Sequence, residues 1–82
     1  MDIKTKIGLR IKELRTNKEL TQEGLAWKSE INRTFMNHVE NGRKNVSIQS
    51  LQKIIAGLDS SFKEFFSDEK LFENPSRKRK KN

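Results

Sequence analysis

The chain has 82 residues, enough for one domain with one modest hydrophobic core, and it carries a formal net charge of +7 at pH 7. It contains no cysteine and one histidine, which excludes disulfides, thiolate metal ligands and multi-histidine metal sites. The basic excess favours a polyanionic partner, usually nucleic acid. No apolar run approaches the roughly 18 residues of a membrane-spanning helix, and the first residues lack the apolar core of a signal peptide. We therefore expect a cytoplasmic, nucleoid-associated protein with no membrane partner.

Hydrophobic residues recur at helical spacing, and no strand alternation stands out. The first predicted helix ends at residues 16–18, with Arg10 on its polar side and Leu9 partly exposed. Its apolar stripe consists of Ile3, Ile7, Ile11 and Leu14.

A second, short helix is predicted to begin after Thr21, a good N-cap, and to run to about Lys28. Leu25 and Ala26 should face inward. Trp27 is expected to pack partly buried against the protein rather than to stack on a base.

A third helix, capped by Asn32 and ended by Gly42, should lie across the second after a tight turn. The small side chain of Ala26 lets the two helices cross closely, and Met36 and Val39 seat the third helix on the domain. The opposite face is then polar and turned outward, in a form that fits the major groove of B-DNA. This face consists of Arg33, Thr34, Asn37 and His38.

Two more helices are predicted toward the carboxyl end. Ser47 caps the fourth, whose apolar side consists of Ile48, Leu51, Ile54, Ile55 and Leu58. Ser61 begins a capping box with Glu64 for the fifth. Residues after Pro75 are polar and basic and have nothing to bury, so we expect them to be mobile.

The segments from Leu20 to Ala26 and from Asn32 to Gly42 resemble the Cro/C1-type (XRE-like) helix-turn-helix family of phage repressors. Within and beyond them, Asn32–Phe35 and Glu40–Ser47 are similar to controller proteins of bacterial restriction-modification systems. The resemblance spans roughly residues 5–66. It implies an all-α, compact five-helix lambda-repressor-like domain, which we place at 1–72, followed by a basic flexible tail at 73–82.

The function implied by this resemblance is sequence-specific transcriptional regulation. Controller proteins bind palindromic operator DNA as homodimers and activate or repress their own gene and the endonuclease gene. Pairing of two dimers on DNA and a contact to RNA polymerase stay open. Catalysis is not expected and no cofactor is implied, because no carboxylate pair, nucleophile–base set or phosphate-cradling glycine loop stands out.

Two alternatives to the controller-protein hypothesis stay open. One is a phage-type or other XRE-like repressor. The other is an antitoxin or protein-interaction module of the same fold, although antitoxins usually add a long partner-binding segment and only a short basic one follows Phe66.

DNA contacts are expected from the two short helices and the loop after them. Gln22 should meet a phosphate, because a helix N-terminus has free N–H groups and a positive dipole end. Arg33 should read guanine through two hydrogen bonds to O6 and N7. The loop residues should hold phosphates, which sets register without reading sequence. The predicted DNA-binding set is Thr21, Gln22, Asn32, Arg33, Thr34, Asn37, His38, Arg43, Lys44, Asn45 and Gln49.

The resemblance also assigns structural roles. Arg15 and Glu40 should form a partly buried ion pair that ties the first helix to the recognition helix. Glu30 stands where the family usually has Gly or Asn at positive φ, so it should carry roughly 1 kcal/mol of strain. Gly24 should weaken its helix by roughly 1 kcal/mol and removes the capping box. The dimer contact is expected from Phe62, Phe65, Phe66 and Phe72.

Overall fold

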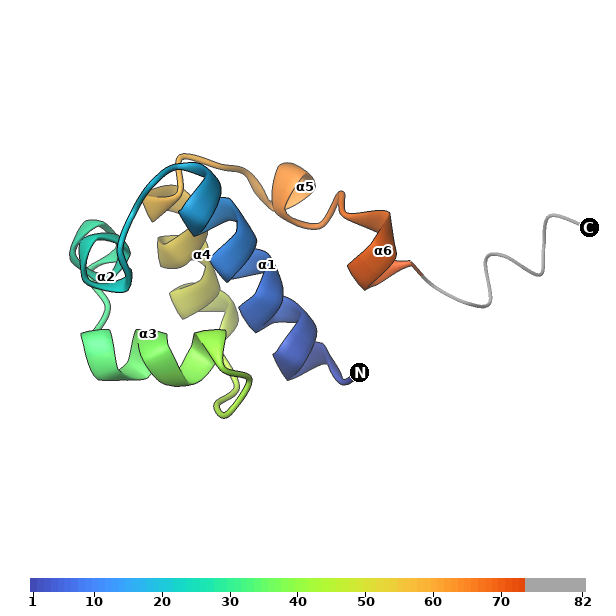
Figure 1. The fold of residues 1–82 in the computed structure, drawn as a ribbon, viewed down its shortest axis with the longest axis horizontal. Coiled ribbons are helices and arrows are strands. Elements are labelled where there is room, and N and C mark those ends of the chain that lie inside the picture. Colours follow the sequence, from blue (N-terminus) through green and yellow to red (C-terminus); the bar gives the residue numbers. More distant parts are fainter. Residues whose placement is uncertain (74–82) are drawn as a thin grey trace, which may run out of the picture.

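The computed structural model describes residues 1–73, and within this range the secondary structure is entirely helical. Apart from its first residue, the predicted tail at 73–82 lies outside the described residues. Figure 1 shows α1 and α4 running through the middle of the domain, with α2 and α3 on one side and α5 and α6 toward the carboxyl end. No helix within residues 1–73 combines the length and the apolar character that crossing a bilayer requires. The helices are α1 (Ile3–Asn17), α2 (Gln22–Ser29), α3 (Arg33–Glu40), α4 (Ile48–Gly57), α5 (Phe62–Phe65) and α6 (Glu69–Phe72).

The predicted helix starts are confirmed by their caps. The side chains of Thr21, Asn32 and Ser47 each accept a hydrogen bond from the backbone N–H three residues later. Ser61 caps α5 in the same way. The predicted capping box is only half formed, because the Glu64 carboxylate accepts from the Ser60 hydroxyl (2.7 Å) instead of returning to the cap.

The last part of the domain differs from the five-helix prediction. The fifth helix ends at Phe65, and a separate short helix, α6, follows with Asp68 as its N-cap. The Asp68 carboxylate accepts from the backbone N–H groups of Lys70 and Leu71. This local cap explains why the chain begins a new turn of helix rather than extending α5.

One contiguous core lies at the meeting point of α1 to α5, and its members match most of the predicted apolar faces. Leu9, predicted to be partly exposed, is on the surface. The buried hydrophobic residues are Ile7, Ile11, Leu14, Leu25, Ala26, Met36, Val39, Leu51, Ile54, Ile55, Leu58 and Phe65.

Three hydrophobic side chains that were expected to pack inward lie on the surface instead. Ile3 and Ile48 are the first residues of α1 and α4, where the helix has not yet reached the core. Trp27 is 84% exposed. At 3.6 residues per turn it points about 150° away from the mean direction of Leu25 and Ala26, so those residues bury the opposite face of α2.

Arg10 was expected on the polar side of the first helix, and this prediction is wrong. Its Nε donates to the Phe65 carbonyl oxygen (2.7 Å) and its Nη2 to that of Glu64 (2.8 Å). These carbonyls lie at the end of the short α5, where Glu64 also accepts from the Ser67 hydroxyl (2.8 Å), and the buried guanidinium joins α5 to α1. Arg10 lies three residues after Ile7 and four before Leu14, a spacing that places it on the apolar stripe.

Candidate nucleic-acid interface

The turn between α2 and α3 has the geometry that the sequence predicts. Glu30 is left-handed (φ 57°, ψ 41°), as expected for the position before a recognition helix. The next N–H, from Ile31, donates to the Ala26 carbonyl oxygen (2.9 Å) and closes the end of α2. The left-handed residue reverses the chain within a few residues, so that α3 begins directly beside α2.

The recognition helix α3 packs on the core through its buried face and ends at the predicted glycine. Met36 and Val39 are fully buried in the core. Gly8 of α1 lies directly against the end of α3, since a Cβ added there would meet the Val39 carbonyl oxygen at 2.5 Å. Gly42, with φ 72°, ends the helix in the left-handed conformation that favours glycine. These contacts fix both the rotation of α3 and its distance from the domain.

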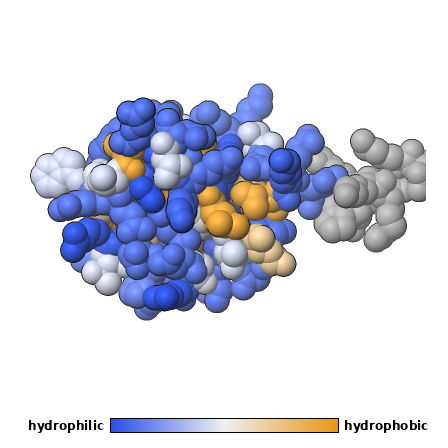
Figure 2. Space-filling view, in the orientation of Figure 1, coloured by the Kyte–Doolittle hydropathy of each residue, from blue (hydrophilic) through white to orange (hydrophobic). Residues whose placement is uncertain are grey.

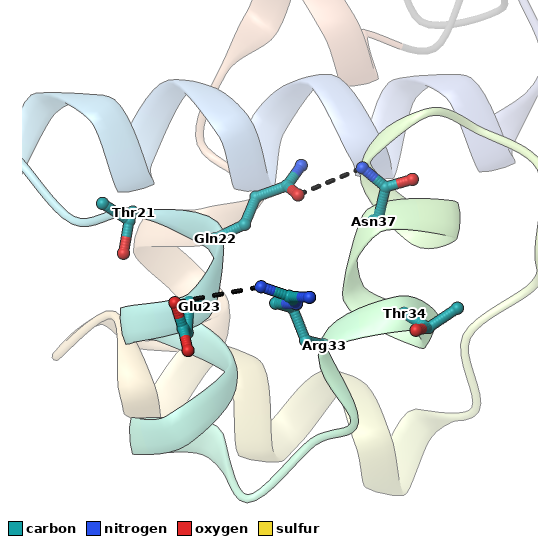
Figure 3. Close-up of a pocket in the computed structure, with 6 residues that line it drawn as sticks. All are labelled: Thr21, Gln22, Glu23, Arg33, Thr34 and Asn37. Carbon is teal, nitrogen blue, oxygen red and sulfur yellow. Dashed lines mark hydrogen bonds and ion pairs between the residues drawn. The ribbon is translucent and has the colours of Figure 1, made fainter.

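An open, polar cavity of about 460 Å³ lies between the outer faces of α2 and α3 (Figure 3). Arg33 and Thr34 are exposed on it, and Asn37 is partly exposed. The predicted outward face of α3 is therefore present at these positions. The lining residues are Thr21, Gln22, Glu23, Arg33, Thr34 and Asn37.

Arg33 points across this cavity toward α2, where its Nη1 lies 3.9 Å from the Glu23 Oε1 (Figure 3). The two side chains are 67% and 78% exposed. An ion pair between such exposed groups contributes little stability, because water screens it. Arg33 is therefore free to exchange Glu23 for another partner.

His38, the fourth residue of the predicted outward face, is less accessible than Arg33 and Thr34. Its side chain is partly buried, and its Nδ1 is buried without a hydrogen-bond partner among the described residues. By the helical repeat His38 lies one turn after Thr34, so the face that these two residues share becomes less accessible toward the carboxyl end of α3.

The remaining predicted DNA-binding residues are exposed on the surface but do not line this cavity. Asn32 is exposed, but its Oδ1 is used to cap α3, accepting from the Phe35 N–H at 3.1 Å. Gln49 is exposed in the first turn of α4. The loop between α3 and α4 presents three exposed side chains, those of Arg43, Lys44 and Asn45.

The predicted ion pair between Arg15 and Glu40 is present. The Arg15 Nε and Nη2 donate to the two carboxylate oxygens of Glu40 at 2.6 and 3.0 Å, and its Nη1 donates to the Leu20 carbonyl oxygen at 2.7 Å. The Glu40 side chain is only 1% exposed. This pair links α1 and the start of α2 to the carboxyl end of α3.

The pair continues into a hydrogen-bond network that the sequence reasoning missed. Gln22 Nε2 donates to Glu40 Oε1 (3.0 Å), and Asn37 Nδ2 donates to Gln22 Oε1 (3.1 Å) (Figure 3). Asn41 Nδ2 donates in turn to Asn37 Oδ1 (3.3 Å). Two residues predicted only as DNA contacts are thus also linked to a buried carboxylate, Gln22 directly and Asn37 through Gln22. The only sign of this network in the sequence was the spacing of Asn37 and Asn41, which places them one helical turn apart.

The four phenylalanines of the predicted dimer contact divide into two kinds. Phe65 is fully buried in the core, so it has no surface to offer a partner. Phe62 and Phe66 are 40% and 38% exposed. Phe72 is partly buried, and its ring meets that of Phe66 edge-on with centroids 4.9 Å apart.

The site has no metal-binding character within the part of the chain that the structure describes. Residues 1–73 contain no group of three His, Asp or Glu side chains placed to hold an ion. The open cavity, the exposed arginine and the hydrogen-bonding amides instead suit an elongated polyanion with polar base edges.

Comparison with known proteins agrees with this arrangement. A helix-turn-helix family model matches residues 11–65. The control protein C.MunI from a Mycoplasma species is 44% identical over 68 residues, which cover 82% of this chain and 92% of the relative. The solved controller protein C.AhdI from Aeromonas hydrophila is 41% identical, with a TM-score of 0.74 over 77% of this chain and 96% of its own. The controller protein C.Esp1396I, solved as a tetramer in complex with its natural 35 base-pair operator, is 37% identical to this chain. The match has a TM-score of 0.78 and covers 82% of this chain and 88% of the C.Esp1396I chain.

Proposed function

Because this chain belongs to the helix-turn-helix family, and within it to the restriction-modification controller proteins, we propose that it binds palindromic operator DNA as a homodimer. In this role it activates or represses its own gene and that of the endonuclease. The observation that carries the proposal is the open polar face of α3, on a helix that Met36, Val39 and the Arg15–Glu40 pair hold to the domain. The protein acts in the cytoplasm, on the nucleoid, and has no catalytic activity.

Recognition follows from the position of α3 at the surface. The helix enters the major groove, where Arg33 reads guanine and Thr34 and Asn37 meet neighbouring base edges or phosphates. The N-terminus of α2, with Thr21 and Gln22, faces a phosphate. Flanking phosphates are held by Asn32, Arg43, Lys44, Asn45 and Gln49, which set register.

Dimerisation places two recognition helices on the two halves of the operator. Figure 2 shows hydrophobic surface on the side of the molecule where α6 lies beside the first turns of α1. Phe62, Phe66 and Phe72 supply aromatic surface at this carboxyl-terminal end of the domain. We propose these three residues, without Phe65, as the aromatic part of the dimer contact.

A mobility-shift titration with the DNA upstream of the protein's own gene tests the proposed function. We expect a discrete complex that saturates at two chains for each palindrome and persists against excess random DNA. Equal affinity for the operator and for random DNA of the same length would contradict it.

Replacing Arg33 with alanine should weaken operator binding by about 1–3 kcal/mol and relax the preference at one base pair in each half-site. The loss removes two hydrogen bonds to guanine while leaving the fold intact, because the side chain is exposed. Competition with operators changed at single positions measures this. The control Lys12→Ala, on the exposed side of α1, should keep the wild-type pattern. Equal loss on operator and random DNA would make Arg33 a phosphate contact instead.

Replacing Phe66 with lysine should convert the dimer to monomers, because the charge cannot be buried in an apolar contact. Light scattering measures the mass, and operator affinity should fall in parallel. The control Trp27→Lys removes a more exposed aromatic ring from a different surface and should leave the dimer intact. The core residue Phe65 is unsuitable for this test, since a charge there would unfold the domain. A stable Phe66→Lys dimer would move the interface elsewhere.

A further inference from the structure

A continuous chain of hydrogen bonds leads from a buried carboxylate to the exposed face of the recognition helix. It starts at Glu40, passes through Gln22 and Asn37, and ends at Asn41. Every member after Glu40 is a side-chain amide, which has a donor end and an acceptor end. The direction in which each amide faces therefore matters chemically.

The carboxylate determines the direction of the whole chain. A carboxylate accepts hydrogen bonds and cannot donate them, and both oxygens of Glu40 already accept from Arg15. Gln22 must therefore turn its NH₂ group toward Glu40, which leaves its oxygen facing α3. That oxygen can only accept, so Asn37 must turn its own NH₂ group toward it. The Asn37 oxygen then faces the NH₂ group of Asn41.

Asn37 keeps half of its hydrogen-bonding capacity in this arrangement. One N–H is used by Gln22 and one lone pair by Asn41, so one donor and one acceptor remain. Asn37 also lines the open cavity between α2 and α3. A fixed donor beside a fixed acceptor matches the major-groove edge of adenine, with acceptor N7 and donor N6. Guanine offers two acceptors there, and one of them would oppose the Asn37 oxygen.

We propose that Asn37 reads an adenine in each half-site, and that Gln22 and Glu40 are positioning residues that fix its amide in the adenine-reading direction. This inference rests on the proposed operator binding and specifies one base of it. Gln22 thus acts on sequence preference through Asn37, in addition to any phosphate contact of its own. The two effects are separable, because losing a phosphate contact weakens binding to all sequences alike, whereas releasing Asn37 changes the ranking of sequences.

The experiment compares the base preferences of four full-length proteins. Wild type, Asn37→Ala, Gln22→Leu and Gln52→Leu are each titrated against a set of operators in which every half-site position carries each of the four bases. Gln52 is an exposed glutamine on α4 outside the network, so Gln52→Leu controls for the substitution itself. Thermal melting of each protein confirms that the folded form is being compared.

We expect the wild type to prefer adenine at one position by roughly 5- to 150-fold over other bases, and Asn37→Ala to lose this preference. Gln22→Leu should reduce the same preference by about fivefold, the effect of one modest hydrogen bond, with the other positions unchanged. Gln52→Leu should match the wild type.

Three results overturn the proposal while leaving operator binding intact. They are an unchanged profile for Asn37→Ala, a lost preference for a base other than adenine, and a Gln22→Leu variant that binds all operators more weakly with the same ranking. If instead the wild type does not distinguish the operator from random DNA, the proposed function itself fails, and the inference fails with it.

Discussion

Replacing Glu40 with glutamine should lower the free energy of unfolding by about 3 kcal/mol, because the Arg15 guanidinium would stay inside the protein without a counter-charge. The side chains of Glu40 and Arg15 are only 1% and 11% exposed, and three hydrogen bonds hold Arg15 in this position. For a small domain this is a large share of the total stability. Urea denaturation followed by circular dichroism measures the change, which should appear as a lower midpoint at an unchanged slope.

A matched control is provided by the surface pair of Lys28 and Asp59. Its nitrogen and oxygen are 3.2 Å apart, but the Asp59 side chain is 71% exposed. Asp59→Asn is also a carboxylate-to-amide change, and asparagine tolerates the left-handed conformation of this residue (φ 55°). Exposed ion pairs contribute at most about 1 kcal/mol, so this variant should stay within that range of the wild type. Equal effects of the two substitutions would mean that burial of Glu40 is not what makes it important.

The sequence was sufficient to predict the helix-turn-helix itself, because its determinants are local. Capping residues act on N–H groups three positions away, and Met36 and Val39 lie one turn apart on the same face. The left-handed Glu30 was predicted from its place in the family pattern, and the structure confirms the backbone conformation. The exposure of Trp27 could also have been predicted, since the helical repeat alone turns its side chain away from that of Leu25.

The features that were missed depend on contacts between distant parts of the chain. Arg10 looked like one more surface charge until the carbonyl groups of Glu64 and Phe65, more than fifty residues away, came within reach of it. The role of Gln22 also depends on a distant residue, because its partner Glu40 comes close only when α2 packs against α3. Hydrophobic periodicity reports which face of a helix is buried, but it does not reveal which polar group will need a partner there.

Replacing Gly8 with alanine should destabilise the domain by about 3 kcal/mol and weaken operator binding even where the protein is still folded. The added Cβ would lie 2.5 Å from the Val39 carbonyl oxygen and 2.6 Å from that of Glu40. Both are backbone atoms that no side-chain rotation can move, so α1 and α3 must separate, at the cost of overpacking a close contact. Because α3 carries the reading face, its displacement moves Arg33 and Asn37 relative to the domain.

Gly24→Ala is the matched control, since it also places a methyl group on a helical glycine. Its nearest atoms would be the Thr21 Oγ1 at 3.2 Å and the Leu20 Cδ2 at 3.8 Å, both on side chains. The higher helix propensity of alanine offsets the tighter contact, so stability should change by less than about 1 kcal/mol. Thermal melting gives the stabilities, and operator titration at low temperature gives the affinity of the folded forms. A Gly8→Ala protein with wild-type melting and wild-type affinity would show that close contact with α1 does not set the position of α3. In that case the recognition helix would be positioned by its apolar seat and the Arg15–Glu40 pair alone.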